Sequence, residues 1–451
     1  MTTATKTDQC FNGLFSSFHE EAARRQPAEL TALRDAAFKQ FCATGFPSVR
    51  EEEWRFTNVA PVERLSFELA KPAAGEISPD QVSLAGVRGL DSHEIVFVNG
   101  HFSAELSNLQ KLPQGVIVCS LAEILREGGN KTVSAELGRQ TGFDKSAFQA
   151  LNLAFVSDGA FVHIPKGVVL ADPLEILYLS TGGDQPTVSF PRNLIVVEEQ
   201  GQLTVLENYE GVNAGNTYLT NAVTEIVVRA HANVDYYRLQ CEDPGAFHFG
   251  SLQVQQEEQS NFRSHAITLG ASLSRNDLGL TLVGENCEGT LNGLYMIGQK
   301  QLADTHTRID HAVPNCLSHE LYKGILKDDA RGVFNGYILV RPDAQKTDAK
   351  QTNKCLLLSP TAQINTNPQL EIYADDVKCT HGATIGQLDE NSIFYLRSRG
   401  IEEHDARCLL TYAFANDIIR RIKIEPLRNQ LEDIVLVAQD VKAKPSTLEV
   451  K

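Results

Sequence analysis

The pattern of apolar and polar positions divides the chain into three regions. Between residues 155 and 388 the apolar residues come in short runs rich in Val, Ile, Leu, Tyr and Thr, separated by Gly, Asn, Asp and Pro. Apolar and polar positions alternate within these runs, and no amphipathic helix intervenes. This alternation is typical of strands, and it predicts a mainly β core flanked by two other regions.

Residues 1–154 are predicted to form an N-terminal region of helices and mixed structure. Apolar residues recur every three or four positions from Leu30 to Phe41, which is the spacing of one helix face. Pro27 and Gly45 are residue types that favour the start and the stop of a helix. The rest of this region predicts one strand and one short helix, at 95–98 and 121–126.

Residues 389–451 return to the helical period. They predict a helix over 389–399 that ends at Gly400, a second over 402–422, and a third after Pro426. A stack of strands exposes its last pair unless another element covers them. We therefore expect these helices to form a C-terminal cap that closes the end of the β core.

A faint internal repeat decides between β architectures. A small, a polar and an apolar residue open successive strand runs, and these triplets start at Gly201, Ala232, Ser260, Gly289, Gly332 and Ala362. The steps between them are 31, 28, 29, 43 and 30 residues. Steps of about 30 residues are typical of stacked coils, whereas propeller blades take about 40 to 50. The core is predicted to be a parallel β-helix (solenoid), with an insertion at 304–321 within the 43-residue step.

Composition and charge narrow the range of partners. The chain has 451 residues, with 57 acidic and 41 basic side chains, and a formal net charge of -16. This charge disfavours nucleic acid phosphates and anionic membrane surfaces as partners. No apolar run reaches the roughly 18 residues that span a bilayer, and the N-terminus carries no apolar leader. We expect a cytoplasmic protein that binds neither nucleic acid nor membrane.

Several common motifs are missing from the sequence. There is no Gly-Lys dipeptide, which excludes a phosphate-binding P-loop, and there is no GxGxxG, GxSxG or HExxH. The nine cysteines form no CxxC pair, so neither a zinc ribbon nor a dithiol redox motif is indicated. We expect reduced and mostly buried thiols, and no nucleotide hydrolysis by this chain alone.

Cys379 and His381 form the first candidate site. Residues 377–381 match the earlier repeat segment 362–366, so the two side chains are expected on the same face of one strand. A thiolate beside an imidazole suits iron, copper or zinc. Two ligands do not close a metal site, so the others must come from elsewhere or from a second chain. The alternative is a core thiol and a histidine that makes only structural hydrogen bonds.

The predicted insertion is the second candidate site. It holds six potential ligands within sixteen residues: Asp304, His306, Asp310, His311, Cys316 and His319. Their spacings match no closed zinc pattern, so histidines that bond backbone carbonyls at a polar edge are the alternative. Cys355 is a third thiol, one coil before Cys379, for which a core position is the alternative. The acidic run at 51–53 is expected to be solvated.

The segment from Pro368 to Gly400 closely resembles the C-terminal signature of the SufB/SufD family, which are core subunits of the Suf iron-sulfur cluster assembly complex. The similarity covers most of the chain and includes 318–324, 331–336, 345–349 and, near the N-terminus, 52–57. In the B-type subunit the motif reads His-Glu-Ala-Thr, whereas here Gly382 follows His381. This difference identifies the chain as similar to the D-type subunit.

The resemblance implies a right-handed parallel β-helix that pairs with a SufB-like subunit and binds a SufC-like ATPase, with the ATPase contact on the C-terminal helices. It implies a non-catalytic scaffold that assembles a transient iron-sulfur cluster at the partner interface, where His381 contributes and Cys379 lies beside it. The missing P-loop agrees with an ATPase on a separate chain. A homodimer in isolation and the binding of a flavin stay open.

Two other classes of function stay open beside this one. A polysaccharide lyase or hydrolase can also use a parallel β-helix, with carboxylates in a groove lined by aromatic rings. A single tryptophan and the lack of a secretory signal count against it. The other class is a stand-alone metal-dependent enzyme built on the insertion, and a stoichiometric metal in the isolated chain would favour it.

Overall fold

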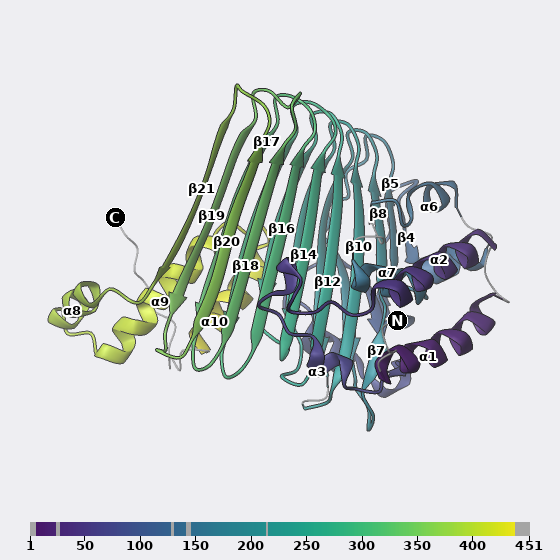
Figure 1. Ribbon diagram of the computed structural model, residues 1–451, viewed down its shortest axis with the longest axis horizontal. Helices are drawn as coiled ribbons and strands as arrows, with labels where there is room; N and C mark the ends of the chain where they lie inside the picture. Colours follow the sequence, from purple (N-terminus) through teal and green to yellow (C-terminus); the bar gives the residue numbers. More distant parts are fainter. Residues whose placement is uncertain (1–5, 24–27, 128–129, 141–145, 213–214, 438–451) are drawn as a thin grey trace.

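The computed structural model describes residues 6–23, 28–127, 130–140, 146–212 and 215–437. Its centre is a solenoid of parallel strands in which each coil contributes one strand to each of two sheets. Figure 1 shows these coils stacked side by side, with β21 at one end and the N-terminal helices at the other. The predicted parallel β-solenoid is confirmed, with eight coils in the described part of the chain.

Sheet A consists, in spatial order, of β4 (Ile117–Ser120), β5 (Ala160–Ile164), β8 (Arg192–Val197), β10 (Tyr218–Val228), β12 (Phe247–Gln256), β14 (Leu273–Leu282), β16 (Leu302–His311), β18 (Arg331–Val340) and β20 (Gln363–Ile372), with β7 (Thr187–Ser189) beside β10 and β1 (Glu68–Leu69) beside β7. Sheet B consists of β3 (His101–Asn108), β2 (His93–Val98), β6 (Leu174–Ser180), β9 (Gln202–Gly211), β11 (Asn233–Cys241), β13 (Asn261–Thr268), β15 (Glu288–Ile297), β17 (Leu317–Leu326), β19 (Asp348–Leu357) and β21 (Lys378–Gly386). Strands that precede residue 155 therefore belong to both sheets.

The coil length is regular, and the predicted insertion is wrong. Successive strands of sheet B from β11 to β21 start 28, 27, 29, 31 and 30 residues apart. Residues 304–321 fall in β16 and β17, which are ordinary strands of one coil. The 43-residue step arose because Gly289 lies in sheet B and Gly332 lies in sheet A. The match of 377–381 to 362–366 crossed sheets in the same way, because β21 pairs with β19.

The corners between strands use a backbone conformation that most residues avoid. One corner of successive coils carries a non-glycine residue with positive φ, and these are Gln200, His231, Gln259, Asn286, Asn315 and Lys346. The left-handed conformation reverses the chain within a few residues, and it strains side chains other than Gly, Asn and Asp. The ladder of backbone hydrogen bonds on both sides of each corner holds these residues in place.

The N-terminal region covers the first coils of the solenoid. Its helices are α1 (Lys6–Ala23), α2 (Ala28–Thr44), η1 (Glu52–Trp54), α3 (Ala60–Glu63), η2 (Ala74–Glu76), α4 (Pro79–Ala85), α5 (Leu121–Arg126), α6 (Lys131–Glu136) and α7 (Ala147–Ala154). Phe11, Phe41 and Phe155 belong to the apolar core that joins this region to sheet A. The predicted stop at Gly45 is confirmed by its φ of 66° and its N–H bond to the Phe41 carbonyl. Pro27 lies outside the described residues.

The C-terminal helices exist as predicted, but their position corrects the expected cap. They are α8 (Glu390–Ser398), α9 (Glu403–Ile419) and α10 (Glu425–Val437). Ile418 and Leu431 pack against the outer face of sheet B, and Lys323 in β17 donates to the Phe414 carbonyl at 3.0 Å and pairs with Asp417 at 2.9 Å. The apolar side of the helices is therefore buried against the outer face of sheet B. Among the described residues, no element covers the strands of the last coil. None of the described helices combines the length and the apolarity needed to cross a membrane.

Candidate functional site

The last coil, formed by β20 and β21, presents Cys379 and His381 at the open end of the solenoid. In the ladder, Cys379 pairs with Ala349 and His381 pairs with Gln351. Both partners point into the interior and are at most 1% exposed. Strand alternation therefore places Cys379 and His381 on the same inward face, as their spacing predicts. No further coil follows β21 among the described residues, and that face is open to solvent: His381 is exposed and Cys379 is half-buried.

The open end combines apolar surface with unpaired backbone. Ile372 and Ile385 are large apolar side chains of the last coil that are 40% and 48% exposed. Each of β20 and β21 pairs with a neighbour on one side only. An uncovered strand edge of this kind is a template for another β structure, and monomeric proteins usually block it. The open end therefore has the properties of an interface.

The surroundings of Cys379 disfavour ionisation of its thiol. Burial raises the pKa of the Cys379 thiol, a backbone hydrogen bond from Ala349 opposes this, and the negative charge of Asp348 raises the pKa again. The thiolate form is the one that binds metal or attacks sulfur. A positive charge, a base or a metal that arrives at the open end would therefore favour the reactive form of Cys379.

Cys355 is a core thiol that does not join the open end. It is 3% exposed, and its Sγ lies 3.2 Å from the Tyr295 hydroxyl. Burial raises the pKa of this thiol. Its ladder partner is Ile385, six residues beyond Cys379 on β21, which is about 20 Å along an extended strand.

The structure disperses the second candidate site. His306 lies on the outer face of sheet A, whereas His311, on the same strand, points inward and its Nε2 lies 2.9 Å from the Ser318 hydroxyl. Burial lowers the pKa of His311 to about 4. His319 lies on the outer face of sheet B. Because side chains alternate along a strand and the two sheets face apart, these histidines do not converge, and no group of three or more His, Cys, Asp or Glu in the described residues suits a metal.

Cys316 instead faces a second corner thiol, Cys287, in the preceding coil. Both are at most 1% exposed, and both Sγ atoms lie within 3.3 Å of the Gly284 carbonyl oxygen. A hydrogen bond from Cys316 lowers the pKa of Cys287 to about 7 and raises the pKa of Cys316. The sequence held no signal for this pair, because the two residues are 29 positions apart and meet only through the coil register.

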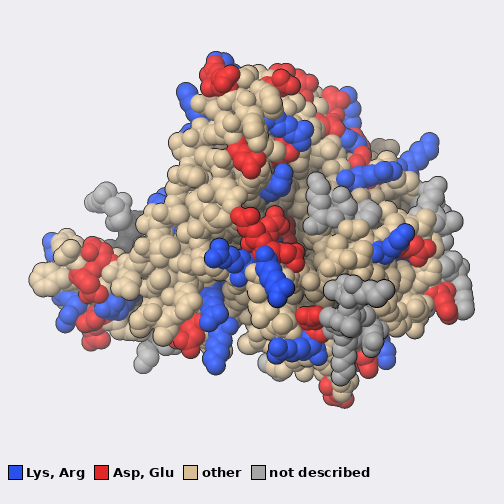
Figure 2. Space-filling model, in the orientation of Figure 1, with Lys and Arg blue, Asp and Glu red and all other residues tan. Residues whose placement is uncertain are grey.

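A groove of about 810 Å³ separates the N-terminal region from the outer face of sheet A. Figure 2 shows a hollow on this face where acidic side chains gather, and Glu51, Glu52 and Glu53 are among the residues that line the groove. All three glutamates are exposed, as the acidic run predicts. The aromatic rings of the groove do not form a sugar platform, because Arg275 covers the Trp54 ring at 3.7 Å and Arg308 covers the Tyr337 ring at 4.7 Å.

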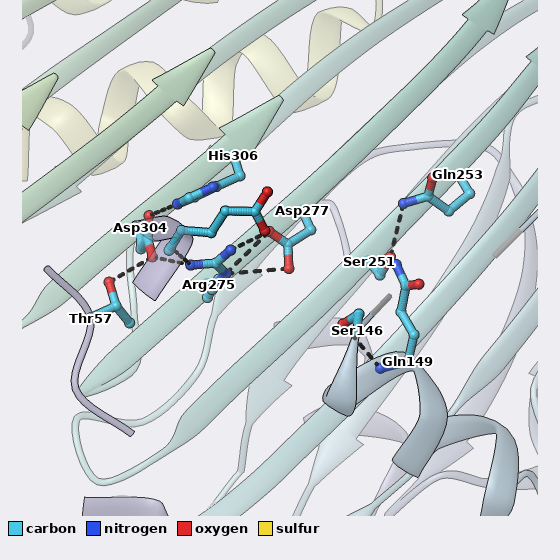
Figure 3. A network of polar contacts seen from close by, with 10 residues as sticks. Thr57, Ser146, Gln149, Ser251, Gln253, Arg275, Asp277, Asp304 and His306 are labelled. Carbon is cyan, nitrogen blue, oxygen red and sulfur yellow. Dashed lines mark hydrogen bonds and ion pairs between the residues drawn. The ribbon is translucent and has the colours of Figure 1, made fainter. Parts of the chain in front are cut away.

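A buried charge network at the groove floor fastens the N-terminal region to the solenoid (Figure 3). Asp304 accepts a hydrogen bond from the Thr57 hydroxyl at 2.6 Å and from Arg275 Nη1 at 2.8 Å, and its other oxygen lies 3.0 Å from His306 Nε2. Burial favours the neutral acid, but His306 and Arg275 outweigh it and lower the pKa of Asp304 to about 2. Arg275 Nη1 also donates to the Glu53 carbonyl at 2.8 Å. His306 therefore lies within this structural network, beside Asp304.

Comparison with known families agrees with this architecture. Residues 178–414 match the SufBD core domain of the SUF system for FeS cluster assembly, and residues 5–176 match the SufBD protein N-terminal region. The chain, a β-solenoid preceded by this N-terminal region, therefore belongs to the SufB/SufD family of iron-sulfur cluster assembly proteins.

The D-type subunits are among its relatives. The iron-sulfur cluster assembly protein SufD of Escherichia coli is 33% identical over 419 residues, which cover 92% of this chain and 93% of the relative. The SufD protein of Bacillus subtilis is 27% identical and is covered to 99%. A SufBD family protein of Synechocystis is 36% identical over 86% of both chains. These relationships favour neither the polysaccharide-active enzyme nor the stand-alone metal enzyme.

Proposed function

We propose that this chain is the D-type scaffold subunit of a Suf assembly complex in the cytoplasm. It pairs through its open end with a homologous B-type β-solenoid, and the nascent iron-sulfur cluster is the cargo built between them. The observation that carries this proposal is the common inward face of Cys379 and His381, which only the open end exposes. The chain itself performs no hydrolysis.

The chemistry of the open end suits a shared and transient site. The Cys379 sulfur and the His381 imidazole are ligands of the type that iron accepts, and two ligands leave positions for a partner to fill. Incoming iron or a basic partner group offsets the raised pKa of Cys379 and stabilises the thiolate. Incomplete ligation also allows release, because a cluster held by a closed set of ligands would stay bound.

The surface of the open end supports a second β-solenoid as partner. Ile372 and Ile385 supply apolar contact, and the free edges of β20 and β21 supply backbone donors and acceptors. The same features allow two copies of this chain to pair when the B-type partner is absent.

Mutation of His381 tests the proposal. In His381→Ala we expect an assembled complex with its ATPase running, but loss of iron-sulfur maturation in cells, because alanine removes the imidazole with little change in packing. The measurement is the activity of an iron-sulfur reporter enzyme that depends on this pathway, at equal complex abundance. His404→Ala, an exposed histidine on α9, is the matched control, and Cys355→Ala should have a much weaker effect. Normal maturation in His381→Ala would contradict the proposal.

A further inference from the structure

Two buried polar side chains lie beneath His381 in the interior of the solenoid. Gln351 is the ladder partner of His381, and Glu320 is the ladder partner of Gln351. Gln351 is 1% exposed and Glu320 is 3% exposed. Parallel strands are about 4.8 Å apart, so the three inward side chains stack from the open end into the interior. The core around them is largely apolar, so polar residues at these positions call for an explanation.

The Gln351 amide is held in one orientation. Its Nε2 donates a hydrogen bond to Glu320 Oε2 at 2.8 Å. The amide nitrogen and oxygen point in different directions, so this bond turns Oε1 away from Glu320. Gln351 Oε1 is buried and has no hydrogen-bond donor among the described residues. Buried acceptors without a donor are rare in folded proteins, and they are a sign of an unfilled role.

The ladder places His381 next to Gln351, on the side of the open end. The neighbouring interior amide, Asn353, already donates to the Thr366 hydroxyl of β20 at 2.9 Å. On the opposite sheet, Gly336 makes room for the Gln351 amide, because a Cβ there would lie 2.2 Å from Gln351 Nε2 and 3.0 Å from Oε1. Burial raises the pKa of Glu320 to about 7, and the hydrogen bond from Gln351 partly offsets this rise.

We propose that Gln351, oriented by Glu320, is a positioning residue for His381. Gln351 Oε1 accepts a hydrogen bond from one ring N–H of His381, which fixes the tautomer and turns the other ring nitrogen toward the open end. A histidine whose N–H is bonded in this way is a better ligand through its second nitrogen. The role in assembly rests on the proposed function, but the hydrogen bond does not.

The reactivity of His381 tests the hydrogen bond without reference to clusters. The purified full-length chain is treated with diethyl pyrocarbonate at neutral pH, and the modification rate of His381 is read from its peptide by mass spectrometry. Loss of the acceptor makes the free ring nitrogen less nucleophilic. We expect Gln351→Leu, and Glu320→Leu, which removes the acceptor that orients Gln351, each to lower the rate by about threefold or more, the scale of one net hydrogen bond. Gly336→Ala, which displaces Gln351, should act in the same direction.

A swapped pair and a control separate positioning from packing. The double variant Glu320→Gln/Gln351→Glu places an acceptor directly beneath His381, with a donor below it, and should restore the rate. Gln256→Leu removes an equally buried amide that hydrogen-bonds near Ser260 in another coil, and should leave the rate unchanged. An unchanged rate in Gln351→Leu overturns the proposal, and so does an equal fall in Gln256→Leu.

The reporter assay then assigns the consequence for assembly. If Glu320→Leu lowers both His381 reactivity and iron-sulfur maturation at equal complex abundance, the positioning role is supported. If reactivity falls, His381→Ala abolishes maturation and Glu320→Leu matures clusters normally, the role in assembly is refuted. If His381→Ala also matures clusters normally, the proposed function fails, and the hydrogen bond is still judged by the reactivity alone.

Discussion

Glu175 is an acid that the fold buries without a basic partner. Its Oε1 accepts a hydrogen bond from Asn208 Nδ2 at 3.1 Å and from the Val87 N–H at 3.3 Å. Burial raises the pKa of Glu175 to about 7, the negative charge of Glu94 adds to this rise, and the two hydrogen bonds oppose it. Such a group makes the free energy of unfolding depend on pH.

Glu175→Gln should increase stability at high pH. The folded chain keeps the Glu175 proton up to about pH 7, whereas the unfolded chain loses it near 4.5, so the wild type loses stability as the pH rises between these values. The gain of the variant should be small near pH 4.5, and it should grow to about 2–3 kcal/mol at pH 8. Urea unfolding at a series of pH values measures it, with the exposed Glu105→Gln as control. A gain that does not vary with pH would argue against a buried acid.

At the scale of single residues, the sequence predicts what lies within one strand and misses what lies across strands. A two-residue spacing suffices to place Cys379 and His381 on one face, because alternation is a local property. Gln351 and Glu320 lie 30 and 61 positions before His381, and coil steps vary from 27 to 31 residues. Spacing alone therefore does not reveal which residues stack. The prediction of a histidine cluster at 304–321 was wrong for the same reason.

Between elements, Arg275 joins η1 to the solenoid. It is 2% exposed and contacts Asp304, Asp277, the Glu53 carbonyl and the Trp54 ring. Removal of this cation leaves Asp304 buried with much of its compensation lost.

Arg275→Met should therefore destabilise the chain by about 3–5 kcal/mol. The N-terminal region should also loosen first, and proteolytic cleavage between residues 45 and 60 should appear before the solenoid unfolds. Chemical denaturation and limited proteolysis measure these two effects. Arg308→Met removes an exposed arginine from the Tyr337 ring. It should change the free energy of unfolding by no more than about 1 kcal/mol, and it should produce no early cleavage. A variant that unfolds in one step with no early cleavage would show that η1 is held by other contacts.

The exposed side of α8 is where we expect the ATPase partner. Phe394 and Tyr395 are 72% and 57% exposed, and α8 contacts α9 but little of the solenoid. In Phe394→Ala/Tyr395→Ala we expect the ATPase to be lost from the purified complex with no change in thermal stability. Deletion of 401–451 is a poorer test, because it also uncovers the apolar face of sheet B. Phe56→Ala, an exposed aromatic of the N-terminal region, is the control, and retention of the ATPase by the double variant would contradict this assignment.

Local signals predict which elements form, but not where they pack. Asp389 accepts hydrogen bonds from the first backbone N–H groups of α8, and Gly400 follows that helix in the left-handed conformation, so both of its ends could be predicted from the sequence. The packing of α9 along sheet B could not, because an apolar helix stripe does not specify its counterpart. The corner residues with positive φ were missed for a different reason. Residues such as Gln259 and Lys346 carry no sequence signal of a conformation that the stacked coils impose.

On the scale of the whole molecule, the two ends of the solenoid differ. The first coils carry additional strands, with β4 antiparallel to β5 and β3 antiparallel to β2, and the N-terminal helices pack against sheet A. Among the described residues, the last coil has no such cover. The parallel edges of β20 and β21 are therefore the ones at which we expect association.

Ile385→Asp should abolish association at this end without unfolding the chain. Ile385 is 48% exposed, so its replacement removes little buried surface, but a carboxylate in an apolar interface would be buried without a partner. Sedimentation of the full chain, alone and with the B-type subunit, measures the effect. Leu84→Asp alters a more exposed apolar residue on α4 and should leave association intact. Association that survives Ile385→Asp would place the interface elsewhere.

The difference between the two ends also bears on how many molecules can join through their strand edges. A solenoid with two free ends is a bifunctional monomer, and it can grow into a chain of unlimited length, as fibrils do. At the other end the terminal strands β3 and β4 run antiparallel to their neighbours, so the parallel ladder of the coils is not continued there. A pair joined through β20 and β21, as proposed above, would therefore carry antiparallel strands, and no parallel coil, at both of its outer ends. Its Cys379 and His381 face would lie at the centre of the pair, and a reactive inorganic intermediate formed there would be shielded from bulk solvent.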